Sequence, residues 1–262
     1  MGTEATKPVV IKIGGSTLGS HDTTIEDLIT LQRRGVHLVV VHGGGNKVTE
    51  WLKRQNTPTS FIDGLRVTDE NSLEMVAAVL GGLVNTDLVA AVNLRGGQAV
   101  GMTGVDGNML ESAITRPELG YAGKITKVNP EAVQAVVDAG FIPLIAPPGA
   151  KAPEEPANIP YVNINGDDIA AELACALEAG RLIFLTDVDG IRGSDSEILP
   201  QLTASEVQSL MESGVIAGGM IAKAEAALIA LKVTPQVQII DGRMPHALIE
   251  AIEGKTGGTT IG

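Results

Sequence analysis

Two lysines, one aspartate and two glycine-rich turns are the residues of this sequence whose types and positions suit phosphate chemistry. Lys12 interrupts the apolar run 9–13, which is followed directly by Gly14 and Gly15. This pattern predicts a buried strand that ends in a tight turn, with the ammonium group at the sheet edge where α/β proteins bind ligands. The two glycines would let backbone N–H groups approach an anion. The alternative is a structural lysine that reaches solvent beside an ordinary turn.

A second glycine-rich turn follows the next predicted strand. The apolar run 36–41 is expected to be a strand covered on both faces, and it ends in His42, Gly43, Gly44 and Gly45 before a helix. Because both turns follow parallel strands, they are expected on the same edge of the sheet, with their backbone donors around one cleft. His42, at the end of the strand, is interpreted as structural rather than catalytic.

Further charged residues complete the set that could act on a phosphoryl group. Lys223 is expected in the first turn of a helix over 220–231, where its charge opposes the helix dipole by roughly a few tenths of a kcal/mol unless an anion binds there. Asp167 is expected at another helix start, from which it could hold Lys12 and Lys223 in place. Two ammonium groups flanking a phosphoryl group stabilise its developing charge. Each charge alone is more typical of a surface, but together with the glycine turns they predict phosphoryl transfer.

Composition narrows the classes of protein that remain. The chain has 262 residues and a formal net charge of −12, which argues against non-specific binding to nucleic acid or to an anionic membrane. Cys175 is the single cysteine, so no disulfide can form within one chain. The N-terminus lacks a signal-peptide pattern, and the apolar runs are expected to be too short to span a membrane. A cytoplasmic protein is therefore expected.

Common nucleotide and catalytic motifs do not fit the sequence. The tripeptide 254–256 resembles the end of a P-loop, but Ile249 stands where that motif needs glycine, and the tripeptide follows a predicted helix. No strand-linked G-x-G-x-x-G occurs, which argues against a nicotinamide dehydrogenase. Residues 14–18 fail the nucleophile-elbow pattern, and the four histidines lack zinc-ligand spacing. No metal ligand is therefore expected among the side chains.

Strand and helix patterns alternate along the whole chain, which favours an open, mainly parallel sheet in an α/β/α sandwich with two closely joined lobes. The lobes are expected to span residues 1–178 and 179–262. Besides the elements above, we expect a helix at 24–34, a hairpin at 57–67, a long helical segment that Thr68 caps and that continues to Leu94, a strand at 99–102, extended hairpin structure at 109–128, a helix at 130–139, a strand at 141–146, a solvated loop at 151–160, a helix that Asn165 or Asp167 caps, a strand at 182–185, helices at 203–213 and 245–253, a strand at 237–240 and a final edge strand at 259–261.

Six short motifs in this order and spacing resemble the amino-acid kinase family. They lie at residues 12–16, 41–45, 63–68, 163–167, 185–190 and 218–223. Among its members, the chain most resembles those that phosphorylate N-acetyl-L-glutamate. The resemblance implies the amino-acid kinase fold and transfer of the γ-phosphoryl group of ATP, with Mg²⁺, to the side-chain carboxylate of that substrate, the second step of arginine biosynthesis. It also implies amino-acid binding and dimerisation by the first lobe and ATP binding by the second.

The resemblance also implies a role for each residue of the motifs. Lys12 and Lys223 would stabilise the transition state, with Asp167 organising them. The amino-acid substrate would be bound by Gly43, Gly44, Arg66 and Asn163. Phosphate and nucleotide would be bound by Gly14, Gly15, Gly45, Thr186, Asp187, Val188, Asp189, Gly190, Val215, Ile216 and Ala217. The family often has alanine in place of Gly166, a departure that leaves the charges unchanged.

Several alternatives stay open at this point. Kinases that act on aminoadipate or glutamate attached to an acidic carrier protein share most of these motifs, and the net charge of −12 disfavours docking of such a carrier. A nucleotide-binding homologue without catalysis is another alternative, which the intact lysines and Asp167 disfavour, and an aspartokinase is disfavoured because no regulatory domain follows residue 262. We expect a homodimer formed through the helical segment that begins at Thr68. Arginine feedback is expected to be weak or absent, because residues 1–8 are too few for the N-terminal helix of arginine-inhibited members.

Overall fold

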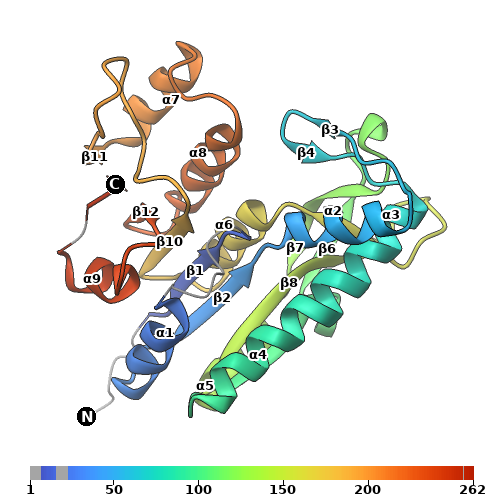
Figure 1. Cartoon of the computed structure of the whole chain (residues 1–262), viewed down its shortest axis with the longest axis horizontal. Helices are drawn as coiled ribbons and strands as arrows, with labels where there is room; N and C mark the ends of the chain where they lie inside the picture. The colour runs from blue at the N-terminus through green and yellow to red at the C-terminus, as the bar shows by residue number, and fades with distance from the viewer. Residues whose placement is uncertain (1–6, 16–22, 256) are drawn as a thin grey trace.

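The computed structural model describes residues 7–15, 23–255 and 257–262 of the chain. A central sheet runs through the molecule, with helices on both faces (Figure 1). Its strands are β1 (Val9–Ile13), β2 (Leu38–His42), β5 (Ala99–Gly104), β6 (Leu110–Ala113), β7 (Ala122–Val128), β8 (Ile142–Lys151), β9 (Tyr161–Ile164), β10 (Arg181–Thr186), β11 (Gln201–Leu202), β12 (Val237–Asp241) and β13 (Thr259–Ile261). The helices are α1 (Thr24–Arg33), α2 (Gly45–Arg54), α3 (Glu70–Val76), α4 (Asn85–Leu94), α5 (Glu131–Asp138), α6 (Gly166–Ala176), α7 (Ala204–Glu212), α8 (Gly219–Ala230) and α9 (Ala247–Glu253).

The centre of the sheet is parallel, as predicted. Strands β12, β10, β1, β2, β8 and β5 are parallel neighbours in this order, and antiparallel pairs occur between β12 and β13, β6 and β7, and β8 and β9. The prediction that 259–261 is an edge strand is wrong, because β13 also pairs with β11. The two residues of β11 are too few to give a periodic sequence pattern. The fold is the open, mainly parallel α/β/α sandwich that the alternation of elements predicts.

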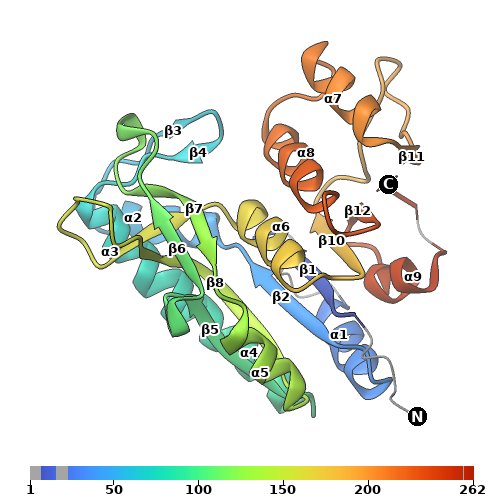
Figure 2. The same ribbon diagram turned by 180° about the vertical axis from the view of Figure 1, so that it is seen from behind.

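Alternate residues of β1 contribute to two different hydrophobic layers. Val10 packs in the cluster that α5, α6 and α8 cover, whereas Ile11 and Ile13 pack in the cluster that α1, α4 and α9 cover. Figures 1 and 2 show these two sets of helices on opposite faces of the sheet. Because side chains alternate along a strand, Lys12 lies on the same face as Val10. The pleat of one strand thus directs the lysine toward α6 and α8.

A long helical segment runs from Glu70 to Leu94 and changes geometry in its middle, where residues Ala77–Val84 form a π-helix, η1. The prediction that Thr68 caps it is wrong, since the Asp69 side chain accepts a hydrogen bond from the Ser72 N–H group. The segment is long and apolar enough to cross a membrane by length and composition alone, contrary to the expectation that no segment would be. Core helices of soluble proteins meet the same criterion, and one side of this segment packs on β5 and β8.

The loop after β8 is more buried than its composition predicts. Glu155 is only 9% exposed, and its carboxylate accepts hydrogen bonds from the N–H groups of Ile114 (2.8 Å) and Ala157 (3.2 Å). Its backbone carbonyl accepts a further hydrogen bond from Lys151 at 2.7 Å. The prediction of a wholly solvated loop at 151–160 is therefore wrong, because one carboxylate satisfies backbone donors that would otherwise be buried without partners.

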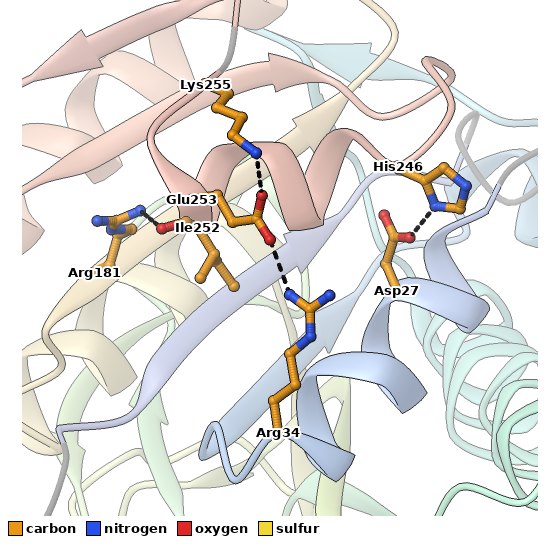
Figure 3. A network of polar contacts seen from close by, with 7 residues as sticks. All are labelled: Asp27, Arg34, Arg181, His246, Ile252, Glu253 and Lys255. Carbon is orange, nitrogen blue, oxygen red and sulfur yellow. Dashed lines mark hydrogen bonds and ion pairs between the residues drawn. The ribbon is translucent and has the colours of Figure 1, made fainter.

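A polar network joins α1 to α9, far apart in the sequence but adjacent in space (Figure 3). His246 Nδ1 lies 2.8 Å from an Asp27 carboxylate oxygen, and Arg34 lies 3.0 Å from Glu253, which also pairs with Lys255 at 2.7 Å. These contacts connect the first helix of the chain with the last one. They fix the second predicted lobe against the helical layer of the first.

Candidate active site

Lys12, Asp167 and Lys223 meet at the carboxyl edge of β1. Lys12 Nζ lies 2.8 Å from Asp167 Oδ1, and Lys223 Nζ lies 3.2 Å from Asp167 Oδ2. All three side chains are largely buried, with exposed fractions of 11%, 6% and 17% in the order Lys12, Asp167, Lys223. The geometric prediction that one carboxylate holds two ammonium groups is confirmed. Helix α8 begins at Gly219, so Lys223 lies at the start of its second turn rather than in the first, where the helix dipole acts more weakly.

The electrostatics of this triad favour an ionised aspartate. Burial raises the pKa of Asp167, but attraction and hydrogen bonds from Lys12 and Lys223 outweigh burial, and the pKa lies below its usual range. Asn165 caps α6 by accepting a hydrogen bond from the Asp167 N–H group at 2.9 Å, as one of the two predicted caps. The cap and the two ion pairs together fix the position of the carboxylate. A net positive charge is left at the sheet edge.

The two glycine-rich turns are in direct contact. A Cβ atom added to Gly15 would lie 3.0 Å from both Cα and N of Gly44, so neither turn has room for a side chain at this point. Gly44 has a φ of 144°, a value that favours glycine, and directly precedes α2. The N–H groups of Gly14 and Gly43 donate to Leu185 O (3.0 Å) and Ile13 O (2.9 Å). The backbone donors expected at Gly14 and Gly43 are therefore already used within the sheet.

A cavity of about 730 Å³ opens beside these turns and extends under the β3–β4 hairpin (β3, Phe61–Ile62; β4, Leu65–Arg66). Among its lining residues, those predicted to bind phosphate or amino acid are Lys12, Gly15, Gly43, Gly44, Gly45, Arg66 and Asn163. Asp168, next to Asp167, lines it as well. The cavity therefore gathers groups from β1, β4, β9 and the turn after β2, which are far apart in the sequence.

Arg66 is held in the cavity wall with part of its guanidinium unpaired. Its Nη2 donates to Gly45 O and to Thr49 Oγ1, both at 2.8 Å, and its centre lies 4.8 Å from the Phe61 ring. Its Nη1 is buried without a hydrogen-bond partner among the described residues. Asn163 donates from Nδ2 to Thr68 Oγ1 at 3.1 Å. An oriented arginine with an unsatisfied donor is suited to bind a carboxylate.

The residues predicted to bind adenine and ribose lie elsewhere. Among the described residues, none of Thr186–Gly190 or Val215–Ala217 lines the 730 Å³ cavity. Thr186 is the last residue of β10, and its carbonyl accepts a hydrogen bond from Gly242 N–H at 2.8 Å. Ile216 is 3% exposed and packs in the hydrophobic core, so its side chain is not accessible. The structure places this second set in the region of β10, α7 and α8.

The sequence did not indicate the residues that support this site. Thr49 and Thr68 hold Arg66 and Asn163, and Asn85 contacts His42. Thr49 has no sequence signal, and Thr68, although it belongs to the motif at 63–68, was expected only as a helix cap. Their supporting contacts become recognisable only from the fold. Asn85 is an amide that follows an apolar stretch, residues 75–84, and this is the signal from which it could have been found. Ser16, His21 and Thr256, which belong to patterns considered above, lie outside the described residues.

Comparison with known proteins identifies the class that this fold and site define. The model of the amino acid kinase family matches residues 7–241, and the chain belongs to that family. It is 42% identical to an acetylglutamate kinase of Dehalococcoides mccartyi over 256 residues, covering 97% of this chain and 94% of that protein. An acetylglutamate kinase of Carboxydothermus hydrogenoformans is 41% identical, with 97% of this chain and 91% of that protein covered.

Solved structures agree with this assignment of the fold. N-acetylglutamate synthase from Neisseria gonorrhoeae, complexed with coenzyme A and N-acetyl-glutamate, superposes with a TM-score of 0.83 at 28% identity. The match covers 97% of this chain but only 59% of that longer protein. Carbamate kinase from Giardia lamblia bound to AMP-PNP has a TM-score of 0.72 at 18% identity, with 99% of each chain covered. At that identity the likeness concerns the fold alone.

Proposed function

We propose that this protein transfers the γ-phosphoryl group of ATP to the side-chain carboxylate of N-acetyl-L-glutamate, giving N-acetyl-L-glutamyl 5-phosphate, the second step of arginine biosynthesis. The observation that carries this proposal is the position of Lys12 and Lys223 on one buried aspartate, at 2.8 and 3.2 Å. Two further observations support it: the unpaired Nη1 of Arg66 in the adjoining cavity, and the acetylglutamate kinases among the relatives.

In the proposed mechanism, a substrate carboxylate oxygen attacks the γ-phosphorus while the bond to the bridging oxygen of ADP breaks. A carboxylate is already ionised at neutral pH, so the enzyme needs no general base. Lys12 and Lys223 stabilise charge that spreads over the phosphoryl oxygens. Asp167 acts as a positioning residue, since it keeps two mutually repelling ammonium groups at one place.

The proposed amino-acid site lies at the hairpin side of the cavity. Arg66 binds the α-carboxylate of the substrate through its free Nη1, while Nη2 stays on Gly45 O and Thr49. Asn163, oriented by Thr68, binds the α-substituents. Gly43 and Gly44 contact the acetylated amino acid, close to Gly15, where the two turns meet.

Nucleotide binding is proposed for the second lobe, residues 179–262, and amino-acid binding for residues 1–178. The adenine and ribose sites are assigned to Thr186, Asp187, Val188, Asp189, Gly190, Val215, Ile216 and Ala217. The phosphate contacts are assigned to Gly15 and Gly45, because the Gly14 N–H group donates to Leu185 O within the sheet. Among the described residues, no group of three or more His, Cys, Asp or Glu side chains is arranged to hold a metal ion. The lysine pair and the glycine turns fit the phosphates, and Mg²⁺ characteristically binds through such phosphates, where it neutralises part of their charge.

We further propose a cytoplasmic homodimer that binds neither nucleic acid nor membrane. The segment from Glu70 to Leu94 supports the dimer, since it keeps apolar side chains exposed, with Leu83 at 40% and Leu94 at 86%. Exposed apolar side chains on this helical segment would be covered by a contact between subunits.

The deciding experiment is a hydroxamate assay of the purified protein with ATP, Mg²⁺ and a panel of acceptors: N-acetylglutamate, N-acetylaminoadipate, glutamate and aspartate. We expect acyl phosphate with N-acetylglutamate. Lys12→Ala should lower kcat at least about a hundredfold while weakening ATP binding far less, because its contact strengthens in the transition state. Equal losses in kcat and ATP affinity would reduce Lys12 to a binding group, and a wild-type protein that is inactive with every acceptor would refute phosphotransfer.

A further inference from the structure

Asn85 and His42 form a buried polar pair directly behind the glycine turn 43–45. His42 is fully buried and Asn85 is 5% exposed. Asn85 Nδ2 lies 2.8 Å from Leu144 O and 3.0 Å from His42 Nε2, while His42 Nδ1 lies 2.8 Å from Gly43 O. These contacts connect the start of α4, the end of β2 and the turn. None of the roles proposed above uses them.

The hydrogen bonds fix the protonation of the imidazole from both ends. A carbonyl oxygen can only accept, so the Asn85 atom at Leu144 O is the amide nitrogen, whose second hydrogen points at His42 Nε2. Nε2 must therefore accept. At the other end Gly43 O can only accept, so Nδ1 carries the hydrogen. Both ends require the neutral Nδ1–H tautomer.

This tautomer anchors one peptide plane of the glycine turn. In a trans peptide the C=O and the following N–H point in opposite directions. With the Gly43 carbonyl held by the buried imidazole, the Gly44 N–H group points away from His42, and Gly44 lines the cavity beside Gly15. Glycine on both sides of this peptide would otherwise allow the plane to rotate.

The long helical segment provides the rigid side of this arrangement. A Cβ atom added to Gly44 would lie 2.7 Å from Leu80 Cδ2 and 3.4 Å from Val84 Cγ2, both in η1. In π-helical geometry, residues four and five positions apart lie on one side, so Leu80, Val84 and Asn85 share the side that faces His42 and Gly44. π-Helical turns are frequent at functional sites. The Asn85 amide oxygen fills space at Gly101, where an added Cβ atom would lie 2.0 Å from Oδ1.

We propose that Asn85 is a positioning residue: it holds His42 as the neutral Nδ1–H tautomer, and His42 in turn fixes the Gly43–Gly44 peptide so that the Gly44 N–H group faces the bound amino acid. This inference rests on the proposed function, because it explains how the glycine turn of the proposed amino-acid site is held in place. Burial lowers the pKa of His42, and Lys12 lowers it further against the opposing effect of the Gly43 hydrogen bond, which agrees with a neutral ring. The pair acts through the backbone and touches no substrate.

The test combines histidine ¹⁵N NMR with kinetics on Asn85→Leu, which removes the amide at similar volume. In the wild type at pH 7 we expect the neutral Nδ1–H tautomer for His42, with its signals assigned by their loss in His42→Asn. Asn85→Leu should release the tautomer and lower kcat/KM for N-acetylglutamate about tenfold or more. The KM for ATP should change less than about twofold, since the adenosine site is assigned to the other lobe.

Two further variants separate positioning from general loss of stability. Asn93→Leu is the matched control, because Asn93 lies on the same helix but away from the turn. Its side chain accepts a hydrogen bond from Ala99 N–H at 2.7 Å and donates one to Ala99 O at 3.2 Å. It should lower the melting temperature without changing the His42 tautomer or kcat/KM. Gly101→Ala should reproduce the Asn85→Leu effect by displacing the amide, and His42→Asn, which can place an amide nitrogen where Nδ1 lies, should retain more activity than His42→Leu.

The outcomes distinguish this inference from the proposed function. A charged or Nε2–H His42 in the wild type overturns the inference whether or not any variant folds. The inference is also overturned if kcat/KM falls no further in Asn85→Leu and Gly101→Ala than it does in Asn93→Leu. If the wild type phosphorylates no acceptor, the proposed function fails. The histidine ¹⁵N NMR comparison of the wild type with Asn85→Leu still decides whether Asn85 sets the tautomer, and the chemical shift of the Gly44 amide, which should change in Asn85→Leu, decides whether the tautomer fixes the turn.

Discussion

Asp168→Asn should make the protein more stable at neutral pH, although it removes an ionisable group from the first turn of a helix. Burial raises the pKa of Asp168 to about 6 from an ordinary 3.8, and Asp167, Glu225 and Glu172 add to the effect while Lys124 partly opposes it. The folded protein therefore holds the Asp168 proton more tightly than the unfolded chain does. Stability from this group is fully present below about pH 3.8 and is lost as the pH rises through about 6.

The magnitude follows from that difference in pKa. At 1.36 kcal/mol per unit, the change from 3.8 to about 6 corresponds to about 3 kcal/mol at most. Asp168 is partly accessible at the cavity wall, and its charge near the N-terminus of α6 is favoured by the helix dipole. Both effects reduce the figure, so we expect Asp168→Asn to be more stable than the wild type by about 1–2 kcal/mol at pH 7.5 and about equally stable at pH 4.

Urea denaturation of both proteins between pH 4 and pH 8 measures this difference directly. Asp87→Asn is a suitable control, because Asp87 lies in the first turn of α4 and is exposed. That exchange should change the free energy of unfolding by less than about 0.5 kcal/mol at every pH. A stability gain from Asp168→Asn that does not vary with pH, or a loss at pH 7.5, would refute the reasoning from burial.

Three further predictions concern the site and the contact between the helical layers. Arg66→Lys should raise KM for N-acetylglutamate about tenfold with kcat less affected, because one ammonium group cannot hydrogen-bond to Gly45 O and Thr49 while it binds a carboxylate. Steady-state kinetics measure this effect, and an unchanged KM would show that Arg66 does not bind the substrate. Asp167→Asn should lower kcat at least about a hundredfold and lower the melting temperature, since two buried ammonium groups lose their shared counterion; activity within tenfold of the wild type would contradict this. His246→Asn keeps a residue type that tolerates the left-handed backbone here. It should destabilise the protein mainly below pH 6.5, because Asp27 raises the pKa of His246 and the resulting stability is lost as the pH rises through the pKa of the folded state. Thermal melts from pH 5 to pH 9 test whether the loss of stability is larger at low pH.

Local sequence patterns predicted most of the helices and strands, and the errors have physical causes. Asn165 was one of two predicted caps of α6, and the structure selects it through a hydrogen bond from the Asp167 N–H group, two residues away. Thr68 was predicted to cap the helix that Asp69 caps in the structure, because threonine and aspartate both favour the cap position. The π-helical geometry of η1 had no sequence signal, because it depends on packing against the Gly44 turn and β8. Of these cases, only the geometry of η1 was decided by contacts beyond the local segment.

For the candidate site, the residue types could be read from the sequence but their supporting contacts could not. Arg66 and Asn163 belong to short motifs, whereas the Asn163–Thr68 hydrogen bond joins residues 95 positions apart. Resemblance to a family placed the named residues in one site, and the structure adds which hydrogen-bonding groups they have left to use. The Gly14 N–H group, expected as a phosphate donor, is instead a donor to Leu185 O within the sheet. Backbone bonding of this kind depends on strand register, which glycine content does not determine.

Strand register also explains why the two lysines can meet at all. In β1, Lys12 is paired with Val41 of β2 and Phe184 of β10, so it lies one residue before the carboxyl ends of β1 and β2 and beside the third-last residue of β10. Its pleat directs the side chain to the face that α6 and α8 cover, and those helices carry Asp167 and Lys223. A shift of one residue in β1 would turn Lys12 to the face of α1 and α9, into the apolar layer where Ile11 and Ile13 pack and away from Asp167. The placement of the proposed phosphoryl site is thus a consequence of the same side-chain alternation that builds the two hydrophobic layers.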